Sequence, residues 1–226
     1  MEASVTECDE GLVFRLSDVA PGQRGLVESD YFTRDGDDYV KTLSPSLPHV
    51  DCAAANFVRY AELVYGEARR SGSPHWREGL LHFLRTIDGR GLEWFLFGSA
   101  AMAIRGIEVV PAGIDIMFPH VSDLVQVRNL FAPDTLRPLT ECEGWVCGAF
   151  GSVFHGCEIT MAFEPQDSLD APDPNDSGRY AASHLQTVSW EGWAIPVPPM
   201  QLLLNINRRR GRDERVRMIM EHMATE

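Results

Sequence analysis

The order of the predicted elements indicates an α+β protein built around a mixed β-sheet. Two helical patterns at 52–70 and 74–88 come first, short apolar runs typical of buried strands follow, and two helical patterns close the chain after residue 199. A helix lies between the first two strand patterns, whereas the later strands follow one another directly, which favours a mixed sheet. With 44% hydrophobic residues among 226, the chain can bury a sizeable core.

The chain divides into three predicted segments: an N-terminal extension over 1–51, an α/β core with its leading helices over 52–198, and a C-terminal helical segment over 199–226. The extension is acidic, with eleven Asp and Glu against four Lys and Arg. Its runs GLVFRLSDV and DYVKTLS predict short strands. We expect the extension to pack on the main body; the alternative is a partly ordered arm.

The leading helices show apolar residues at helical spacing. Asp51 is the predicted N-cap of the first helix, and Ser73 with Pro74 predicts the start of the second. The second helix should bury one face, formed by Trp76, Leu80, Phe83, Leu84 and Ile87. Gly89 and Gly91 should end it.

The central strands are predicted from short apolar runs. EWFLF (93–97) and IDIMF (114–118) should be buried strands that flank a helix from Ser99 to about Arg105. Ser122 is the predicted cap of the next helix, and WVCGAF, SVFH and CEITMAF predict two or three further strands. Residues 164–182, rich in Pro and Asp, read as a loop.

Bulk composition excludes some classes of function. The net charge of −13 argues against non-specific binding to nucleic acid or to an anionic membrane, because both require a basic surface. Lysine occurs once, at Lys41. Five cysteines, an odd number in a chain of this size, do not indicate a disulfide scaffold. Without a signal pattern or a long apolar run, we expect a soluble cytoplasmic protein.

Three side-chain positions suggest a phosphate and metal site. The strand ending in Gly98-Ser99 and followed by a helix start can present backbone N–H groups to a phosphate. Asp115 lies between two isoleucines and should face away from both, and Glu158 repeats this pattern in a later strand. Buried carboxylates are costly unless they are paired or bind a metal, so the set can hold a divalent cation against a nucleotide triphosphate. The alternative for each carboxylate taken alone is an edge residue that faces solvent.

These motifs resemble the nucleotidyltransferase superfamily of the DNA polymerase β type, most closely its small antibiotic-type and minimal members. Phe97-Gly98-Ser99, a spacer over 100–112 and Gly113-Ile114-Asp115 are similar to the family signature, and Glu158 stands where its third carboxylate would be. The ending IPVPPMQLLLNINRRRGRDERVRMIMEH is similar to the family's last helices. The resemblance covers roughly 75–226 and implies the nucleotidyltransferase fold.

The sequence also departs from the family pattern. Gly113 replaces the first aspartate of the signature, and Asn207 stands where a helix lysine is expected. Arg212 replaces the lysine of the Arg-x-Lys-Asp element, and Val216 replaces a frequent acidic residue. The resemblance implies that Asp115 and Glu158 would hold Mg²⁺ as catalytic carboxylates, and that Gly98, Ser99 and Arg212 would bind the nucleotide.

Three further features have more than one interpretation. Cys142, Cys147, His155 and Cys157 could bind zinc, although their spacing does not match the common zinc motifs. The arginines around 208–217 form a basic cluster that is either a solvated helix face or, with Arg212 first, a contact for a triphosphate. The acidic loop 164–182 could cover an acceptor pocket or attract a cationic substrate.

Two functional hypotheses follow. The first is an enzyme that transfers a nucleotidyl group from an NTP, with ATP expected, to a hydroxyl of a small molecule or a protein, with Mg²⁺ as cofactor. The second is a catalytically lapsed protein with the same fold, acting as a nucleotide-binding or protein-interaction module of an antitoxin-like or regulatory kind; Gly113, Asn207 and Val216 favour it. Neither hypothesis calls for a membrane or a nucleic acid.

Overall fold

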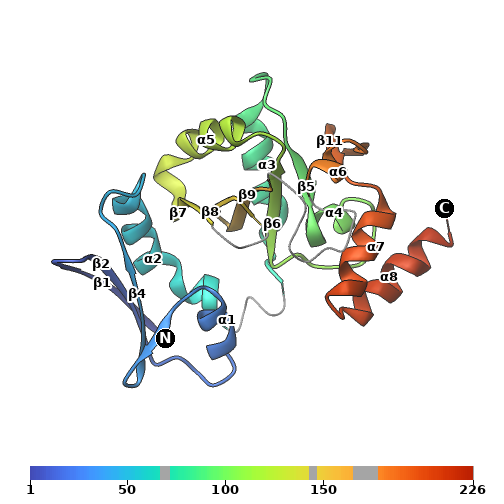
Figure 1. The fold of residues 1–226 in the computed structure, drawn as a ribbon. Helices are drawn as coiled ribbons and strands as arrows, with labels where there is room; N and C mark the ends of the chain where they lie inside the picture. Colours follow the sequence, from blue (N-terminus) through green and yellow to red (C-terminus); the bar gives the residue numbers. More distant parts are fainter. Residues whose placement is uncertain (67–71, 143–146, 165–177, 226) are drawn as a thin grey trace.

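The computed structural model describes residues 1–66, 72–142, 147–164 and 178–225 (Figure 1). A four-stranded antiparallel sheet forms the N-terminal unit, in the order β1-β2-β4-β3. Its elements are β1 (Glu2–Cys8), β2 (Gly11–Ser17), α1 (Arg24–Ser29), β3 (Thr33–Asp35) and β4 (Asp38–Leu43). The strands predicted from GLVFRLSDV and DYVKTLS are confirmed as β2 and β4.

Helix α2 (Val50–Tyr65) joins this sheet to the rest of the chain. Phe57 packs edge-on against Phe14 of β2, with ring centroids 5.1 Å apart. On the other side, the Asn56 amide donates to the carbonyls of Pro133 and Thr135, at 2.9 and 2.8 Å, where β7 begins. The α2 helix is therefore anchored to the N-terminal sheet and to the central sheet together.

Two details of the predicted first helix are wrong. Its N-cap is His49, in the left-handed conformation with φ of 59°, and Asp51 lies inside the first turn without capping it. The helix ends at Tyr65, whereas the prediction ran to residue 70. Residues 67–70 of that prediction lie outside the described part of the chain.

The central sheet has five strands in the order β5-β6-β9-β8-β7. They are β5 (Phe95–Phe97), β6 (Gly113–Phe118), β7 (Thr135–Glu141), β8 (Ala149–His155) and β9 (Cys157–Phe163). Strands β6 and β9 run parallel, and every other neighbouring pair is antiparallel. This confirms the predicted mixed sheet and places the two candidate carboxylate strands side by side.

Helices α3 (Trp76–Ile87), α4 (Gly98–Ala103) and α5 (Val121–Leu130) and the short 3₁₀-helix η2 (Ala132–Asp134) accompany this sheet. The predicted apolar face of α3 is confirmed, since Trp76, Leu80, Phe83, Leu84 and Ile87 all belong to the main core. The predicted cap of α5 is wrong: its N-cap is His120, and Ser122 lies in the first turn.

The C-terminal part contains α6 (Arg179–Ala182), the hairpin β10 (Gln186–Trp190) and β11 (Trp193–Val197), and the predicted closing helices α7 (Met200–Arg209) and α8 (Asp213–Met223). Figure 1 shows the N-terminal sheet and the closing helices at opposite ends of the central sheet. Most of the predicted loop 164–182 lies outside the described residues. In the described part of the chain, no helix is long and apolar enough to cross a membrane.

Candidate functional site

Asp115 lies on the half-exposed face of β6. Ile114 and Ile116 are fully buried on the opposite face, as the alternating pattern predicted. The Thr160 hydroxyl, directly across on β9, lies 2.7 Å from Asp115 Oδ1 and can donate to it. One oxygen of this carboxylate is thus held in place by a short polar contact, while the residue keeps some solvent exposure.

Gly98 makes room for the same carboxylate. It has φ of +63°, a conformation that favours glycine, and it opens α4 directly after β5. A Cβ added at this position would overlap Asp115 Oδ2. Ser99, the next residue, is buried at 7% exposure, and no side-chain hydrogen bond caps the helix. Gly98 therefore lies against Asp115 where β5 ends, at a place that we call the Asp115 edge, and Ser99 follows Gly98 in α4.

Gly113 and Glu158 are paired in the register of β6 and β9. Because Asp115 pairs with Thr160 in the same register, Glu158 and Asp115 occupy adjacent positions on neighbouring strands. A Cβ at position 113 would lie 2.8 Å from the Glu158 carbonyl oxygen, closer than side chains normally approach. The glycine therefore permits close strand contact, and an aspartate here would require the backbone to shift.

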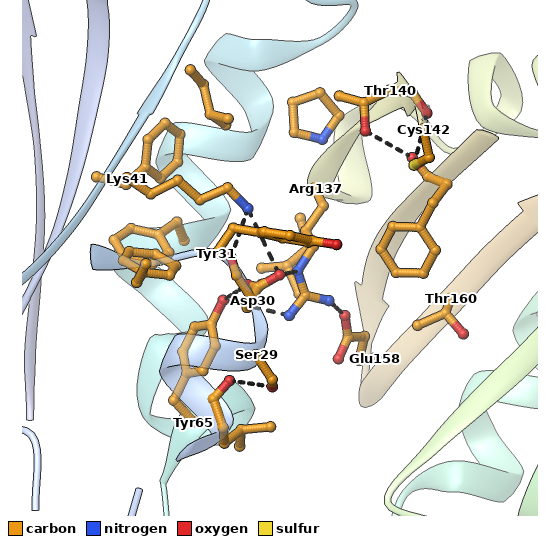
Figure 2. Close-up of a pocket in the computed structure, with 18 residues that line it drawn as sticks. Ser29, Asp30, Tyr31, Lys41, Tyr65, Arg137, Thr140, Cys142, Glu158 and Thr160 are labelled. Carbon is orange, nitrogen blue, oxygen red and sulfur yellow. Dashed lines mark hydrogen bonds and ion pairs between the residues drawn. The ribbon is translucent and has the colours of Figure 1, made fainter. Parts of the chain in front are cut away.

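Glu158 is 3% exposed and forms an ion pair with Arg137 of β7 (Figure 2). Arg137 Nε also donates to Asp30, at 2.9 Å, and Asp30 accepts a hydrogen bond from the Tyr65 hydroxyl. Lys41 Nζ donates to the Asp30 carbonyl at 3.0 Å. Glu158 is therefore the inner end of a buried network that joins the central sheet to the N-terminal unit.

The charges of this network balance, with Lys41 and Arg137 against Asp30 and Glu158. Burial opposes the charge on Arg137, but Tyr65 and Asp30 outweigh it, so the pKa of the guanidinium is raised. Burial raises the pKa of the Tyr65 phenol, which Asp30 reinforces and Arg137 opposes. Arg137 is therefore a cation beside Glu158 and balances its charge, so a metal ion at Glu158 would have to compete with the guanidinium.

A cavity of about 350 Å³ lies beside this network, between the N-terminal unit and the central sheet. Apolar side chains of both parts wall it, including Phe14, Leu26, Phe32, Leu43, Leu136 and Phe150. Its polar lining includes Lys41, Arg137, Glu158 and Thr160. Because Thr160 lines the cavity and also contacts Asp115, the cavity adjoins the Asp115 edge.

The C-terminal arginine Arg212 has a charge interaction with Asp115. Arg212 is exposed in the connection between α7 and α8. Burial, Arg215 and Arg210 lower the pKa of Arg212, and Asp115 acts in the opposite direction. Asn207, which stands where the helix lysine was expected, supplies no positive charge. Its amide donates to the Leu203 carbonyl of its own helix, α7, at 2.7 Å. Arg212 is therefore an arginine of this connection whose charge interacts with that of Asp115.

The cysteine-based zinc interpretation is wrong. Cys147 and Cys157 are buried core residues, and the Cys147 thiol lies 4.0 Å from Glu164. The imidazole of His155 stacks on that of His82 instead. Among the residues that the structure describes, the one group of three or more candidate ligands with mutually close atoms contains no cysteine. None of the five cysteines is part of a disulfide bond.

Several residues of the site were not predicted from the sequence. Thr160 could have been found, since it is two residues after Glu158 and must therefore share its face of the strand. Arg137, Asp30 and Tyr65 gave no such signal. They come from three elements distant in sequence, and only the folded chain brings them to Glu158.

Comparison with known proteins gives a likeness in fold and no match in sequence family. No protein-family model matches the sequence, and no curated protein matches it either. Among solved structures, the chain is similar to a candidate nucleotidyltransferase from Thermotoga maritima, with a TM-score of 0.50 and 16% sequence identity. The match covers 69% of this chain and 96% of the other. At this identity the likeness establishes a nucleotidyltransferase-like α+β fold.

Proposed function

From this shared fold, we propose that the chain binds an Mg²⁺–nucleoside triphosphate, with ATP expected, at the Asp115 edge without catalysing two-metal nucleotidyl transfer. It would act as a nucleotide-dependent binding or regulatory module. The observation that carries the proposal is the ion pair between Arg137 and Glu158. It neutralises the third carboxylate position, while Gly113 leaves the first without a side chain.

Metal binding at the remaining carboxylate is chemically reasonable. Mg²⁺ commonly uses one or two protein carboxylates and completes its shell with phosphate oxygens and water. Asp115 offers one such ligand, with its orientation set by Thr160 and its space provided by Gly98. Arg212 supplies a cation within electrostatic range of Asp115, which suits contact with phosphate oxygens.

Calorimetric titration with a non-hydrolysable ATP analogue, with and without Mg²⁺, tests the nucleotide site. We expect micromolar binding that requires Mg²⁺ and weakens at least about tenfold in Asp115→Asn, a loss of roughly 1.4 kcal/mol or more. Asp123→Asn is the matched control. Asp123 lies on a different element, α5, and its carboxylate accepts a hydrogen bond from the backbone N–H of Glu93. Binding that ignores both Mg²⁺ and Asp115 would contradict the proposal.

A second candidate is the transferase itself, with the 350 Å³ cavity as its acceptor pocket. Thr160 favours it, because this side chain lines the cavity and contacts Asp115 at once. Pyrophosphate release from a mixture of NTPs and Mg²⁺, in the presence of candidate hydroxyl acceptors, separates the two. Release that disappears in Asp115→Asn would support transfer. We expect no release above the Asp115→Asn background.

Replacing Gly113 by aspartate is a poor substitute for this assay. The added Cβ would meet the Glu158 backbone, so the variant would change strand packing as well as charge. A failure to gain activity would then have two explanations. Direct measurement of nucleotide binding and pyrophosphate release avoids this ambiguity.

A further inference from the structure

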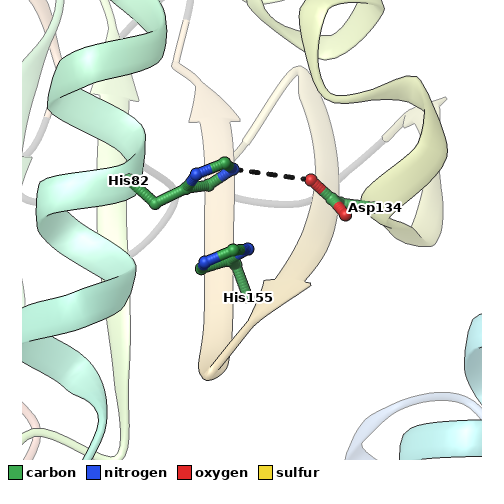
Figure 3. A group of neighbouring side chains, drawn as sticks. All are labelled: His82, Asp134 and His155. Carbon is green, nitrogen blue, oxygen red and sulfur yellow. Dashed lines mark ion pairs between the residues drawn. The ribbon is translucent and has the colours of Figure 1, made fainter.

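His82, Asp134 and His155 form a compact group of candidate ligands outside the nucleotide site (Figure 3). One ligand atom from each lies within 4.8 Å of the other two. The two imidazoles are stacked with centroids 3.6 Å apart and planes 9° apart, and His82 Nε2 lies 3.6 Å from Asp134 Oδ2. The three side chains come from α3, η2 and β8.

The surrounding fold holds these residues close together. A Cβ added at Gly79 of α3 would lie 2.9 Å from both the His155 carbonyl and the Cys157 thiol. The helix therefore sits directly against the end of β8, and His82 is one turn further along its axis. The Phe131 ring packs edge-on against His82 at 5.4 Å, and the Asp134 amide donates to the Phe131 carbonyl at 2.9 Å.

We propose that His82, Asp134 and His155 bind a divalent transition-metal cation of the zinc class. Two imidazole nitrogens and one carboxylate oxygen form a ligand set typical of Zn²⁺, Co²⁺ or Ni²⁺, while Mg²⁺ prefers oxygen ligands alone. Three protein ligands would leave one tetrahedral position open for water or a substrate group. The site would be independent of the nucleotide site in both position and metal preference.

The separation of His82 and Asp134 already suits a metal ion, and His155 must be brought to it by side-chain rotation. Ligand atoms about 2.1 Å from a tetrahedral zinc are about 3.4 Å apart. His82 Nε2 and Asp134 Oδ2 are already close to that separation. Because lone pairs of parallel rings cannot converge on one ion, one imidazole must turn about its χ2 angle, which has a broad and shallow energy profile. Both histidines are partly exposed, so neither ring is fully enclosed by the core.

Calorimetric titration of the full chain with Zn²⁺, and optical titration with Co²⁺, test the site. We expect one ion per chain and a tetrahedral Co²⁺ spectrum without thiolate charge-transfer bands. His155→Gln and His82→Gln should each weaken binding at least about 100-fold, whereas Asp115→Asn should leave it unchanged. Thiolate bands, or affinity that both glutamine variants retain, would overturn the proposal.

His120→Gln is the matched control for adventitious binding. His120 Nε2 lies 3.3 Å from Glu93 at an exposed position, so it offers a histidine–carboxylate pair without a second histidine. This variant should bind Zn²⁺ as the unmodified chain does. X-ray absorption of the Zn²⁺-loaded unmodified chain gives a check that needs no variant to fold. Two imidazoles with one or more oxygen ligands are expected, and sulfur ligation would count against the site.

Discussion

Asp115 and Glu158 lie on neighbouring parallel strands of one sheet, and their carboxylates occupy contrasting surroundings. Asp115 is half-exposed, contacted by the Thr160 hydroxyl and bordered by Gly98. Glu158 is buried and paired with Arg137, which is fixed in turn by Asp30 and Tyr65. A carboxylate therefore stays accessible to solvent in one case and serves as an internal counter-ion in the other.

The largest expected effect is the difference in unfolding free energy between two variants, each of which loses one of these carboxylate charges. Glu158→Gln leaves Arg137 without its inner counter-ion, and breaking a buried pair on one side typically costs about 3–5 kcal/mol of unfolding free energy. Asp115→Asn keeps the shape and can retain the contact with Thr160, so it should cost less than about 1 kcal/mol. Urea denaturation of both variants measures the difference.

An exposed ion pair provides the control for the buried pair between Arg137 and Glu158. Arg77 and Glu191 are 3.0 Å apart, and both side chains are about half exposed. Glu191→Gln should change stability by no more than about 1 kcal/mol, since surface pairs contribute little. Equal losses in Glu158→Gln and Glu191→Gln would mean that the Arg137 network does not bear on stability as the structure implies.

The next effect concerns the space that Gly98 provides. Gly98→Ala combines the strain of a left-handed alanine with an overlap on Asp115, and should destabilise the chain by about 1–3 kcal/mol. It should also weaken Mg²⁺–nucleotide binding. Gly89→Ala is the control, because Gly89 has a similar φ of +68° and nothing within 4 Å of the added atom. If both variants lose equal stability, strain alone explains the glycine.

A smaller effect is expected from the hydroxyl that contacts Asp115. Thr160→Val keeps the side-chain shape and removes the hydroxyl, which lies 2.7 Å from Asp115 Oδ1 and 3.2 Å from the Ile114 carbonyl, with an expected loss of about 1 kcal/mol. Nucleotide binding should weaken several-fold, because the carboxylate loses its fixed orientation. Thr140→Val, which removes a longer 3.4 Å bond to a backbone carbonyl, should leave nucleotide affinity unchanged. Calorimetry on both variants measures this contrast.

The smallest expected effect is a fall in the stability of the folded chain at alkaline pH, caused by Tyr65. The pKa of Tyr65 is raised in the folded chain by burial, so the unfolded chain ionises this phenol first, from a pH of about 10. The folded state then binds more protons, and its stability falls as pH rises above that value. The stability advantage of the unmodified chain over Tyr65→Phe should therefore shrink as the pH rises above about 10. Exposed Tyr31→Phe should show no such trend.

Local sequence patterns predicted most strands around the site, but they did not predict which charged residues pair with its carboxylates. Alternation placed Asp115 opposite two buried isoleucines, and the repeated motif placed Glu158 on an adjacent strand. Strand β7 was missed, because Pro138 interrupts its apolar pattern. Proline is tolerated there since β7 is an edge strand with irregular register.

The charge state of the site could not be predicted from the sequence. Arg137 lies 21 residues before Glu158, and Asp30 lies 107 residues before Arg137, so no local period relates them. Residue type alone did not predict the helix caps either. Asp51 and Ser122 are good capping residues by type, but the helices begin after His49 and His120, and neither N-cap forms a side-chain capping hydrogen bond.

The position of the single lysine makes the N-terminal unit accessible to a simple kinetic measurement. Lys41 lies on β4, an interior strand of its sheet, with its side chain directed into the buried network. A lysine-specific protease has one cleavage point in this chain, and strand pairing protects it. The rate of that cut therefore reports how often the N-terminal sheet opens, without labels or engineered sites.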